Sequence, residues 1–129
     1  MQIDLQMIGR FYTDAEKIPR HWTVSNEDGV ICLEKKFTEA ARDIKTGQQI
    51  VVIFLFDRSR EFTLDDLVQN PKHKNQTMGV FSICSPVRPN PIGISVLEVL
   101  AINGSEIKVK GIDMLNKTPI LDIKPYIKR

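Results

Sequence analysis

Residues 94–112 have the sequence ISVLEVLAINGSEIKVKGI, the clearest secondary-structure signal in the chain. An apolar run from Ile94 to Ile102 leads into Asn103-Gly104, and a second run returns from Ser105 to Ile112. Asn-Gly between two apolar runs is a strong local signature of a β-hairpin. In the returning run, isoleucine and valine alternate with lysines, which is the pattern of a strand with one exposed face. This stretch therefore predicts an antiparallel hairpin.

Other strand candidates flank this hairpin on both sides. The β-branched and aromatic run Ile50 to Phe56 predicts a buried strand. Glu27-Asp28-Gly29 lies between two short apolar runs and predicts a second hairpin turn. Further strands are expected over Ile3–Tyr12 and Ile120–Ile123, and helical turns over Thr38–Arg42 and Thr63–Leu67. The sum predicts a mainly-β chain, with residues 1–129 forming a single small antiparallel or mixed β-barrel with a few short helices.

The composition of the 129 residues, 42% hydrophobic and 26% charged, predicts one globular domain. The longest apolar run has seven residues, whereas a transmembrane helix needs about 18 or more. The first residues lack the basic flank and apolar stretch of a signal peptide, so we expect a cytoplasmic protein without membrane association. Cys32 and Cys84 are isolated, and His21 and His73 are far apart, so no disulfide and no metal site are expected.

The glycine spacing argues against the common nucleotide-binding loops. No two of the seven glycines are closer than seven residues, so neither a dinucleotide fingerprint nor a P-loop can be built from them. The sequence also lacks a Gly-x-Ser-x-Gly elbow and a His-Glu-x-x-His pair. Residues 67–129 hold nine Lys and Arg against four Asp and Glu, a net charge of +5 that suits contact with phosphate. A nucleotide-based ligand is therefore expected outside the usual strand–turn–helix crevice.

The stretch SPVRPNPIG, residues 85–93, is unusually rich in proline. Arg88 and Asn90 each precede a proline, which disfavours helical conformations at both residues and extends the backbone. The result is a stiff segment that presents a guanidinium and a carboxamide with little entropy left to lose on binding. Two interpretations remain open: a ligand-binding arm, or a rigid barrel corner whose polar side chains satisfy loop carbonyls.

The stretch GIDMLNKTPILDIKPY, residues 111–126, places two carboxylates among apolar residues. An ionised carboxylate in such surroundings is costly unless it is paired or hydrogen-bonded. For Asp113 and Asp122, Lys124 or Arg88 is a candidate partner. We expect Asp122 and Lys124 to form an internal ion pair that joins the last strand to the barrel.

The segments SPVRPNPIGIS and GIDMLNKTPILDIKPYI closely resemble the TrmO/YaeB-like family of tRNA methyltransferases, and the likeness extends upstream to Ile8-Gly9 and Pro19-Arg20. The resemblance implies an S-adenosylmethionine-dependent β-barrel enzyme that works as a homodimer on tRNA. Its implied reaction methylates the exocyclic amine of threonylcarbamoyladenosine, the modified base just 3′ of the anticodon. The resemblance implies cofactor-binding roles for Pro19, Arg20, His21, Asp57, Arg58, Cys84, Ile94, Asp113, Met114 and Leu115, and we assign catalytic roles to Arg88 and Asn90.

The chain departs from the family pattern at several of these positions. His21 replaces a glutamine, Asp57 a histidine and Cys84 an arginine, while Asn116-Lys117 replaces Asp-Gly. A backbone contact to the cofactor survives such changes, but a side-chain contact does not. Larger bacterial members continue into a small extra domain associated with tRNA binding, which we expect this chain to lack.

These departures keep two alternatives open. One is a non-enzymatic barrel that binds S-adenosylmethionine or RNA, and the other is a methyltransferase with a different acceptor. The methyl-donor interpretation rests on one structural expectation. Arg88 and Asp113 must line a common hollow, within one chain or across a partner subunit, because the proline-stiffened bend and the aspartate are both expected to contact the methyl donor.

Overall fold

The computed structural model of the chain describes residues 1–72 and 74–129, so His73 lies outside the described residues. Its elements, in chain order, are β1 (Gly9–Tyr12), the 3-10 helix η1 (Trp22–Val24), β2 (Asp28–Leu33), η2 (Lys35–Ala41), β3 (Gln49–Leu55), η3 (Leu64–Asp66), β4 (Val68–Gln69), β5 (Met78–Gly79), η4 (Val80–Ser82), β6 (Ile92–Asn103), β7 (Glu106–Lys110) and β8 (Pro119–Pro125).

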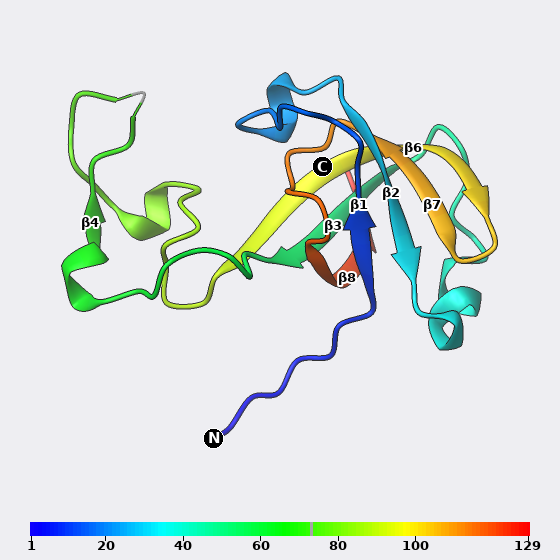
Figure 1. The fold of residues 1–129 in the computed structure, drawn as a ribbon, viewed down its shortest axis with the longest axis horizontal. Helices are drawn as coiled ribbons and strands as arrows, with labels where there is room; N and C mark the ends of the chain where they lie inside the picture. The colour runs from blue at the N-terminus through cyan, green and yellow to red at the C-terminus, as the bar shows by residue number, and fades with distance from the viewer. Residues whose placement is uncertain (73) are drawn as a thin grey trace.

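Six of these strands close into a barrel in the order β1-β2-β7-β6-β3-β8 (Figure 1). Every neighbouring pair in the barrel is antiparallel. Strands β4 and β5 form a separate two-stranded sheet. The prediction of a mainly-β, antiparallel barrel with a few short helices is therefore confirmed. In the part of the chain that the structure describes, no helix is long and apolar enough to cross a membrane.

The predicted hairpin of residues 94–112 is present as β6 and β7, but its turn lies one residue later than the Asn-Gly signature suggests. Asn103 still belongs to β6 and pairs with Glu106, so Gly104 and Ser105 form the two-residue loop. Gly104 has a φ of 61°. This is the position at which a type II′ turn needs glycine, because its first central residue has a positive φ.

The second predicted hairpin turn, at Glu27-Asp28-Gly29, is wrong. Asp28 and Gly29 are part of β2, which pairs with β1 on one side and β7 on the other. A Cβ atom on Gly29 would lie 2.4 Å from the ring of Phe11. The glycine therefore allows close packing of an aromatic side chain against the strand, a role that local sequence does not distinguish from a turn.

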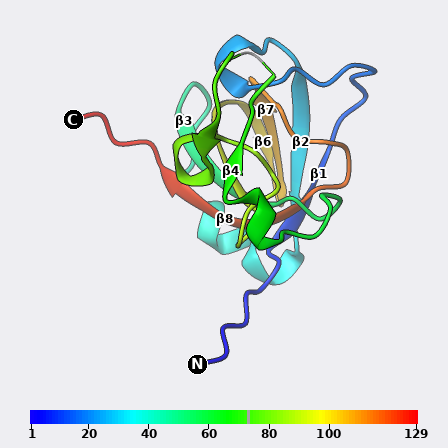
Figure 2. The same ribbon diagram turned by 90° about the vertical axis from the view of Figure 1, so that its left-hand side faces the viewer.

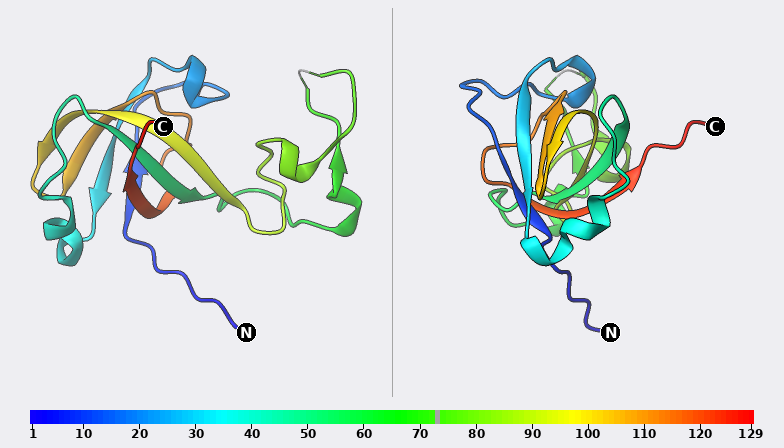
Figure 3. Two further views of the ribbon diagram at one scale, coloured as in Figure 1. Left: turned by 180° about the vertical axis from the view of Figure 1, so that it is seen from behind. Right: turned by 90° about the vertical axis from the view of Figure 1, so that its right-hand side faces the viewer.

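Alternate residues of each strand fill the barrel interior, as the period of a β-strand requires. Along β3 the buried residues are Ile50, Val52 and Phe54, and their neighbours are only partly buried. The side chains that are fully inaccessible include Phe11, Ile31, Val52, Leu97, Val99, Ile107, Val109, Ile112 and Ile120. Burial of each large apolar side chain contributes roughly 1.5–3 kcal/mol, so this cluster dominates the stability of the fold. Figure 3 shows the strands of the barrel from two further sides.

Residues 57–72 and 74–91 extend from one end of the barrel, between the end of β3 and the start of β6 (Figures 1 and 2). We call this segment the arm. Its fold depends on Asp66, which is 7% exposed and accepts two hydrogen bonds from Arg60, at 2.9 and 2.7 Å. Asp66 also accepts from the Thr63 backbone N–H at 3.0 Å and closes a capping box around η3. These bonds to the charged form lower the pKa of Asp66 to about 2.

We expect the arm to lose stability in acid through Asp66. Because its pKa is lowered on folding from an ordinary value of 3.8, the stabilisation is fully present above about pH 4 and is lost as the pH falls toward 2. Thermal unfolding followed between pH 2 and 7 should show this slope in the wild type and a smaller one in Asp66→Asn. Asp65→Asn, which neutralises the exposed neighbouring carboxylate, should keep the wild-type slope.

Candidate functional site

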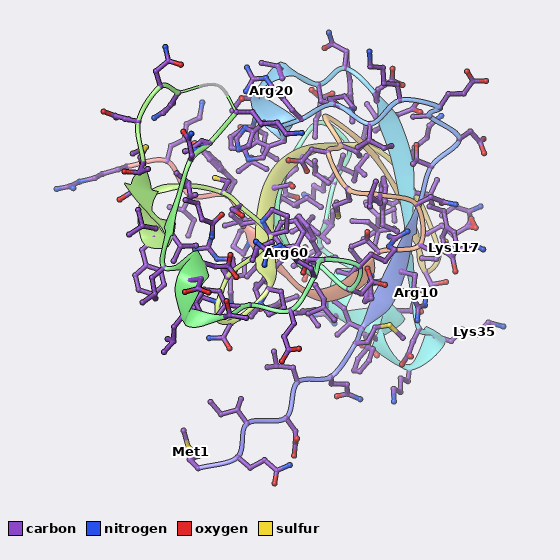
Figure 4. All side chains as sticks on the ribbon, turned by 60° about the vertical axis from the view of Figure 1, so that its left-hand side comes forward. Met1, Arg10, Arg20, Lys35, Arg60 and Lys117 are labelled. Atoms are coloured by element: carbon purple, nitrogen blue, oxygen red, sulfur yellow. The ribbon has the colours of Figure 1, made fainter. Side chains whose placement is uncertain are left out.

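A cavity of about 440 Å³ lies at the end of the barrel from which the arm extends. Four segments contribute residues to its walls: the one before η1, the end of β3, the one that leads from the arm into β6, and the loop before β8. The lining residues fall within 20–21, 54–59, 83–94 and 113–118, although not every residue of these ranges lines the cavity. Closure of the barrel brings these segments together. Figure 4 turns this end of the molecule toward the reader, with Arg20 near the top. The volume is that of a pocket for one small ligand.

Aromatic and aliphatic side chains form one wall of the cavity. The rings of Phe54 and Phe56 meet edge to face, with centroids 5.1 Å apart. Gly93 on the neighbouring strand makes room for them, because a Cβ there would lie 2.4 Å from Phe54 and 2.7 Å from Phe56. Met114, 1% exposed, also lines the cavity. Such a wall suits a planar or apolar part of a ligand.

Asp113 provides a carboxylate in the same cavity. Its Oδ1 accepts a hydrogen bond from the hydroxyl of Ser95, and its Oδ2 accepts one from the Trp22 backbone N–H at 2.9 Å. Burial raises the pKa of the Asp113 carboxyl above its ordinary value, and the two hydrogen bonds oppose this shift only in part. Asp113 forms no ion pair with any described residue. The two hydrogen bonds therefore orient the carboxylate, and the neighbouring His21 also opposes the effect of burial on its pKa.

Arg58 is positioned by two neighbours. Its Nε donates to Asp57 Oδ1 at 3.2 Å, and its Nη2 donates to Thr118 Oγ1 at 3.1 Å. The Thr118 hydroxyl in turn donates to the Leu115 carbonyl at 2.7 Å, which links Arg58 to the loop that carries Asp113. A guanidinium presents several donors in one plane and suits a ligand carboxylate.

Arg88 lines the cavity from the arm and is anchored to its own loop. Its Nη1 donates to the carbonyl of Ile83 at 3.0 Å and to that of Ser85 at 3.1 Å. These contacts are those of a rigid corner whose polar side chain satisfies loop carbonyls. They also hold the guanidinium in place at the cavity, so the two interpretations of this segment are compatible.

Comparison with known proteins places this chain in a family. The model of the tRNA-methyltransferase O N-terminal domain, TrmO_N, matches residues 7–129. The chain belongs to the TrmO N-terminal domain family. A protein of Archaeoglobus fulgidus is described as "Probable S-adenosyl-L-methionine-binding protein". It is 37% identical over an alignment 129 positions long, which covers 98% of this chain and 34% of that protein.

Two further relatives extend the comparison. The human tRNA (adenine(37)-N6)-methyltransferase is 41% identical over 76 residues, 59% of this chain and 17% of the human protein. The crystal structure of TrmO from Pseudomonas aeruginosa superimposes with a TM-score of 0.76 at 28% identity, covering 98% of this chain and 57% of that one. The TrmO-like chain therefore spans about a third of the Archaeoglobus protein and little more than half of the Pseudomonas chain.

The cavity contains most of the residues that the sequence singled out. Arg20, His21, Asp57, Arg58, Cys84, Arg88, Ile94, Asp113, Met114 and Leu115 all line it. Arg88 and Asp113 thus share one hollow, as the sequence analysis requires. Among the substituted positions, Cys84 is exposed, the Asp57 side chain is partly buried and paired with Arg58, and His21 caps η1 by accepting from the Thr23 N–H.

Two of the singled-out residues do not line this TrmO-like cavity. Pro19 precedes the lining residue Arg20, and Asn90 is exposed in the turn that leads into β6. The Asn90 carbonyl accepts from the Ile92 N–H at 2.7 Å, a bond that forms the turn. The Asn90 side chain is therefore outside the lining of the cavity, and its catalytic role stays a prediction.

The predicted ion pair of Asp122 and Lys124 is present, but the prediction that it is internal is wrong. The two charges are 3.0 Å apart, but their side chains are 49% and 59% exposed. The pair lies on the outside of β8, where water screens it and its contribution is small.

Sequence reasoning missed three groups that shape the site: the Ser95 hydroxyl, the Trp22 N–H and the Thr118 hydroxyl. Ser95 carried a signal, because it occupies a fully buried position of β6 between Gly93 and Leu97. A polar residue on the inward face of an apolar strand needs a partner, and here that partner is Asp113. Among the described residues, no three His, Cys, Asp or Glu side chains are grouped so that they hold a metal ion.

Proposed function

We propose that this chain binds S-adenosylmethionine in the cavity and transfers its methyl group to the exocyclic N6 of adenine 37 in tRNA. We further propose that the acceptor adenine carries a threonylcarbamoyl group. The descriptions of the Archaeoglobus protein as a probable S-adenosyl-L-methionine-binding protein and of the human protein as a tRNA methyltransferase support the cofactor and the class of reaction. The observation that carries the proposal is the oriented, unpaired carboxylate of Asp113 in one cavity with Arg20, Arg58 and Arg88.

The donor set of the cavity fits the methyl donor. S-adenosylmethionine has an ammonium, a carboxylate, a sulfonium and an adenine with its ribose. Asp113 is suited to accept from the ammonium or from a ribose hydroxyl, because two hydrogen bonds hold its oxygens in place and it forms no ion pair with a described residue. Arg20 or Arg58 is suited to the carboxylate through bidentate contact. The wall made by Phe54, Phe56 and Met114 suits the planar and apolar parts.

The proposed reaction requires little acid–base catalysis by the protein. The bound cofactor supplies a methyl group that is already electrophilic. The acceptor nitrogen lies between a purine and a carbamoyl carbonyl, so its proton is acidic for an amine. As the N–C bond forms and the S–C bond breaks to leave a neutral thioether, this proton passes to water, and no strong base is required. The residues of the chain therefore act mainly by orientation, which is worth roughly 7–11 kcal/mol of barrier for well-aligned reactants. We assign to Arg88, whose guanidinium is held by the Ile83 and Ser85 carbonyls, the role of orienting the threonylcarbamoyl group.

Replacing Arg88 with alanine tests this assignment. We expect kcat to fall more than tenfold while the Kd for S-adenosylmethionine changes less than threefold, because the lost contact is made to the acceptor. Calorimetry gives the Kd and methyl transfer gives kcat, and a thermal melt monitors the loop that Arg88 anchors. Unchanged turnover in the variant would leave Arg88 with a purely structural role.

The function itself is tested with labelled S-adenosylmethionine and total tRNA that either carries or lacks the threonylcarbamoyl modification. We expect transfer only to the modified tRNA, with the label on N6 of adenine 37 when the nucleosides are identified. Transfer to unmodified tRNA would indicate a different acceptor. Cofactor binding without any transfer would favour a barrel that binds S-adenosylmethionine or RNA without catalysis.

We also propose that the chain acts as a homodimer. Apolar side chains on the arm are exposed in the single chain, among them Leu64 at 78% and Phe81 at 83%. Ile94 and Leu115, which line the cavity, are 58% and 50% exposed. A second copy that covers these side chains would complete the cavity wall. A monomeric mass in solution together with full activity would reject a shared site.

A further inference from the structure

Lys117 has a backbone conformation that is unfavourable for a lysine. Among the described residues, it is the one residue other than glycine with a positive φ, at 72°. In this left-handed region the Cβ atom crowds the backbone, which is why glycine usually occupies it. A strained residue of this kind persists only where its surroundings determine its conformation, and such residues concentrate at functional sites.

The surroundings that hold Lys117 belong to β1 and the residues after it. The Lys117 N–H donates to the Phe11 carbonyl at 2.7 Å, and Arg10 Nη1 donates to the Lys117 carbonyl at 2.9 Å. The preceding residue is fixed as well, because the Thr13 N–H donates to Asn116 Oδ1 at 3.0 Å. All of these contacts use backbone atoms of Lys117 or atoms of its neighbours. A glycine would satisfy them without strain, so the fold does not explain the lysine side chain.

The strained turn lies in the loop that forms one wall of the cavity. Two residues earlier Leu115 lines the cavity, and one residue later Thr118 holds Arg58. Lys117 itself is exposed and does not line the cavity. Its side chain is therefore beside the site but outside it, where part of a large substrate remains in solvent.

Lys117 lies next to a second cation. The hydrogen bond from Arg10 to the Lys117 carbonyl brings this guanidinium to the same turn, and Figure 4 shows both residues on the flank of the barrel formed by β1. Neither residue forms an ion pair with a described residue. Two neighbouring cations without a protein counterion attract an anion, and a guanidinium held in place suits a phosphate.

We infer that Lys117 and Arg10 bind a backbone phosphate of the RNA substrate beside the cavity. This inference rests on the proposed function, which makes RNA the substrate. A phosphate contact carries no sequence information, but it fixes the position and orientation of the nucleic acid. Here it would hold the strand outside the cavity while the target base enters it.

The test compares Lys117→Gly, Lys117→Arg and the control Lys45→Ala. Lys45 is an exposed lysine four residues before β3, whose other end reaches the cavity, so it lies at the far end of the barrel. The Kd for an unmodified anticodon stem–loop RNA is measured at several KCl concentrations by fluorescence anisotropy. Calorimetry with S-adenosylmethionine and thermal melts accompany each variant.

We expect Lys117→Gly to bind the RNA several-fold more weakly. The negative slope of log K against log salt should become less steep by about 0.7–0.9, the value for one lost phosphate contact. Its affinity for S-adenosylmethionine should be unchanged and its Tm equal to or above that of the wild type, since the strain is relieved. Lys117→Arg should keep the wild-type slope because it retains the charge. Lys45→Ala should keep it as well.

The outcomes separate this inference from the function on which it rests. If the wild type binds the RNA and Lys117→Gly keeps its slope, the phosphate contact is overturned and the proposed function stands. An equal loss in Lys45→Ala would reduce the effect to general charge and overturn the contact too. A Tm of Lys117→Gly below that of the wild type would show that the lysine side chain stabilises the loop, and it would overturn the assignment of this side chain to a phosphate. No binding of this unmodified RNA by the wild type would overturn the phosphate contact, whereas the proposed function is decided separately by the methyl-transfer assay with modified tRNA.

Discussion

Asp113→Asn is expected to weaken binding of S-adenosylmethionine by about 10- to 100-fold. This is the loss expected for a hydrogen bond to a charged group, roughly 1.5–3 kcal/mol. Asparagine has nearly the same shape and still accepts the Trp22 N–H, so the change removes charge while leaving the local packing in place. Calorimetric titration measures the effect directly.

The same substitution should leave the fold at least as stable at neutral pH. Burial raises the pKa of Asp113, so its contribution to stability is fully present below its unfolded value of 3.8 and declines as the pH rises through the folded value. Asparagine removes this decline. The Tm of Asp113→Asn at pH 7 should therefore equal or exceed that of the wild type, whereas at pH 4 the two should converge.

Asp122→Asn is the matched control, because Asp122 is a half-exposed aspartate that does not line the cavity. It should change neither the affinity for S-adenosylmethionine nor, appreciably, the stability. Ser95→Ala is an intermediate case that keeps the carboxylate but removes the hydroxyl that orients it. Wild-type affinity in both Asp113→Asn and Ser95→Ala would remove Asp113 from the proposed binding site.

Gly9→Ala should have the largest effect on stability, lowering the free energy of unfolding by about 3 kcal/mol. A Cβ on Gly9 would lie 2.4 Å from the carbonyl oxygen of Cys32 and 2.9 Å from the Cα of Leu33. Both are backbone atoms of β2, so relief requires β1 and β2 to separate where β1 also pairs with β8. Urea denaturation followed by circular dichroism measures the change against a typical total of about 5–15 kcal/mol.

Gly79→Ala provides the control for the backbone effect of replacing a glycine. Gly79 has a φ of −60° and no atom within 4 Å of its added Cβ. Alanine at such a position restricts the unfolded chain and stabilises the protein by up to about 1 kcal/mol. If Gly9→Ala unfolds at the same urea concentration as Gly79→Ala, the close approach of β1 and β2 is not what requires glycine at position 9.

The fold was largely predictable because its main signals are local. The β6–β7 hairpin and the buried strand β3 follow from alternation and apolar runs in a few adjacent residues. Gly29 was misassigned because glycine is required there by close packing against Phe11, which is distant in the sequence. From the local sequence alone, a glycine at this position is equally consistent with a turn. The arm was beyond sequence reasoning in its details, since β4 and β5 have only two residues each.

The site was predictable in composition but not in geometry. Resemblance supplied Arg58 and Asp113, whose common cavity the structure then provides. It did not supply Ser95 or Thr118, because these act through contacts between distant segments rather than through a recognisable motif. Arg88 had two interpretations from its proline-flanked sequence, and its hydrogen bonds to Ile83 and Ser85 make both compatible.

The pairing of Gly9 with Ile120 has a consequence for how the protein matures. The strands that close the barrel are separated by nearly the whole chain, and contacts between such distant segments form late because a long loop must first be restricted. The segment that carries Asp113 directly precedes the closing strand. A nascent or partly folded chain in which β8 has not paired with β1 therefore lacks the complete cavity. Binding of a small molecule in the cavity would indicate that β8 has joined the barrel.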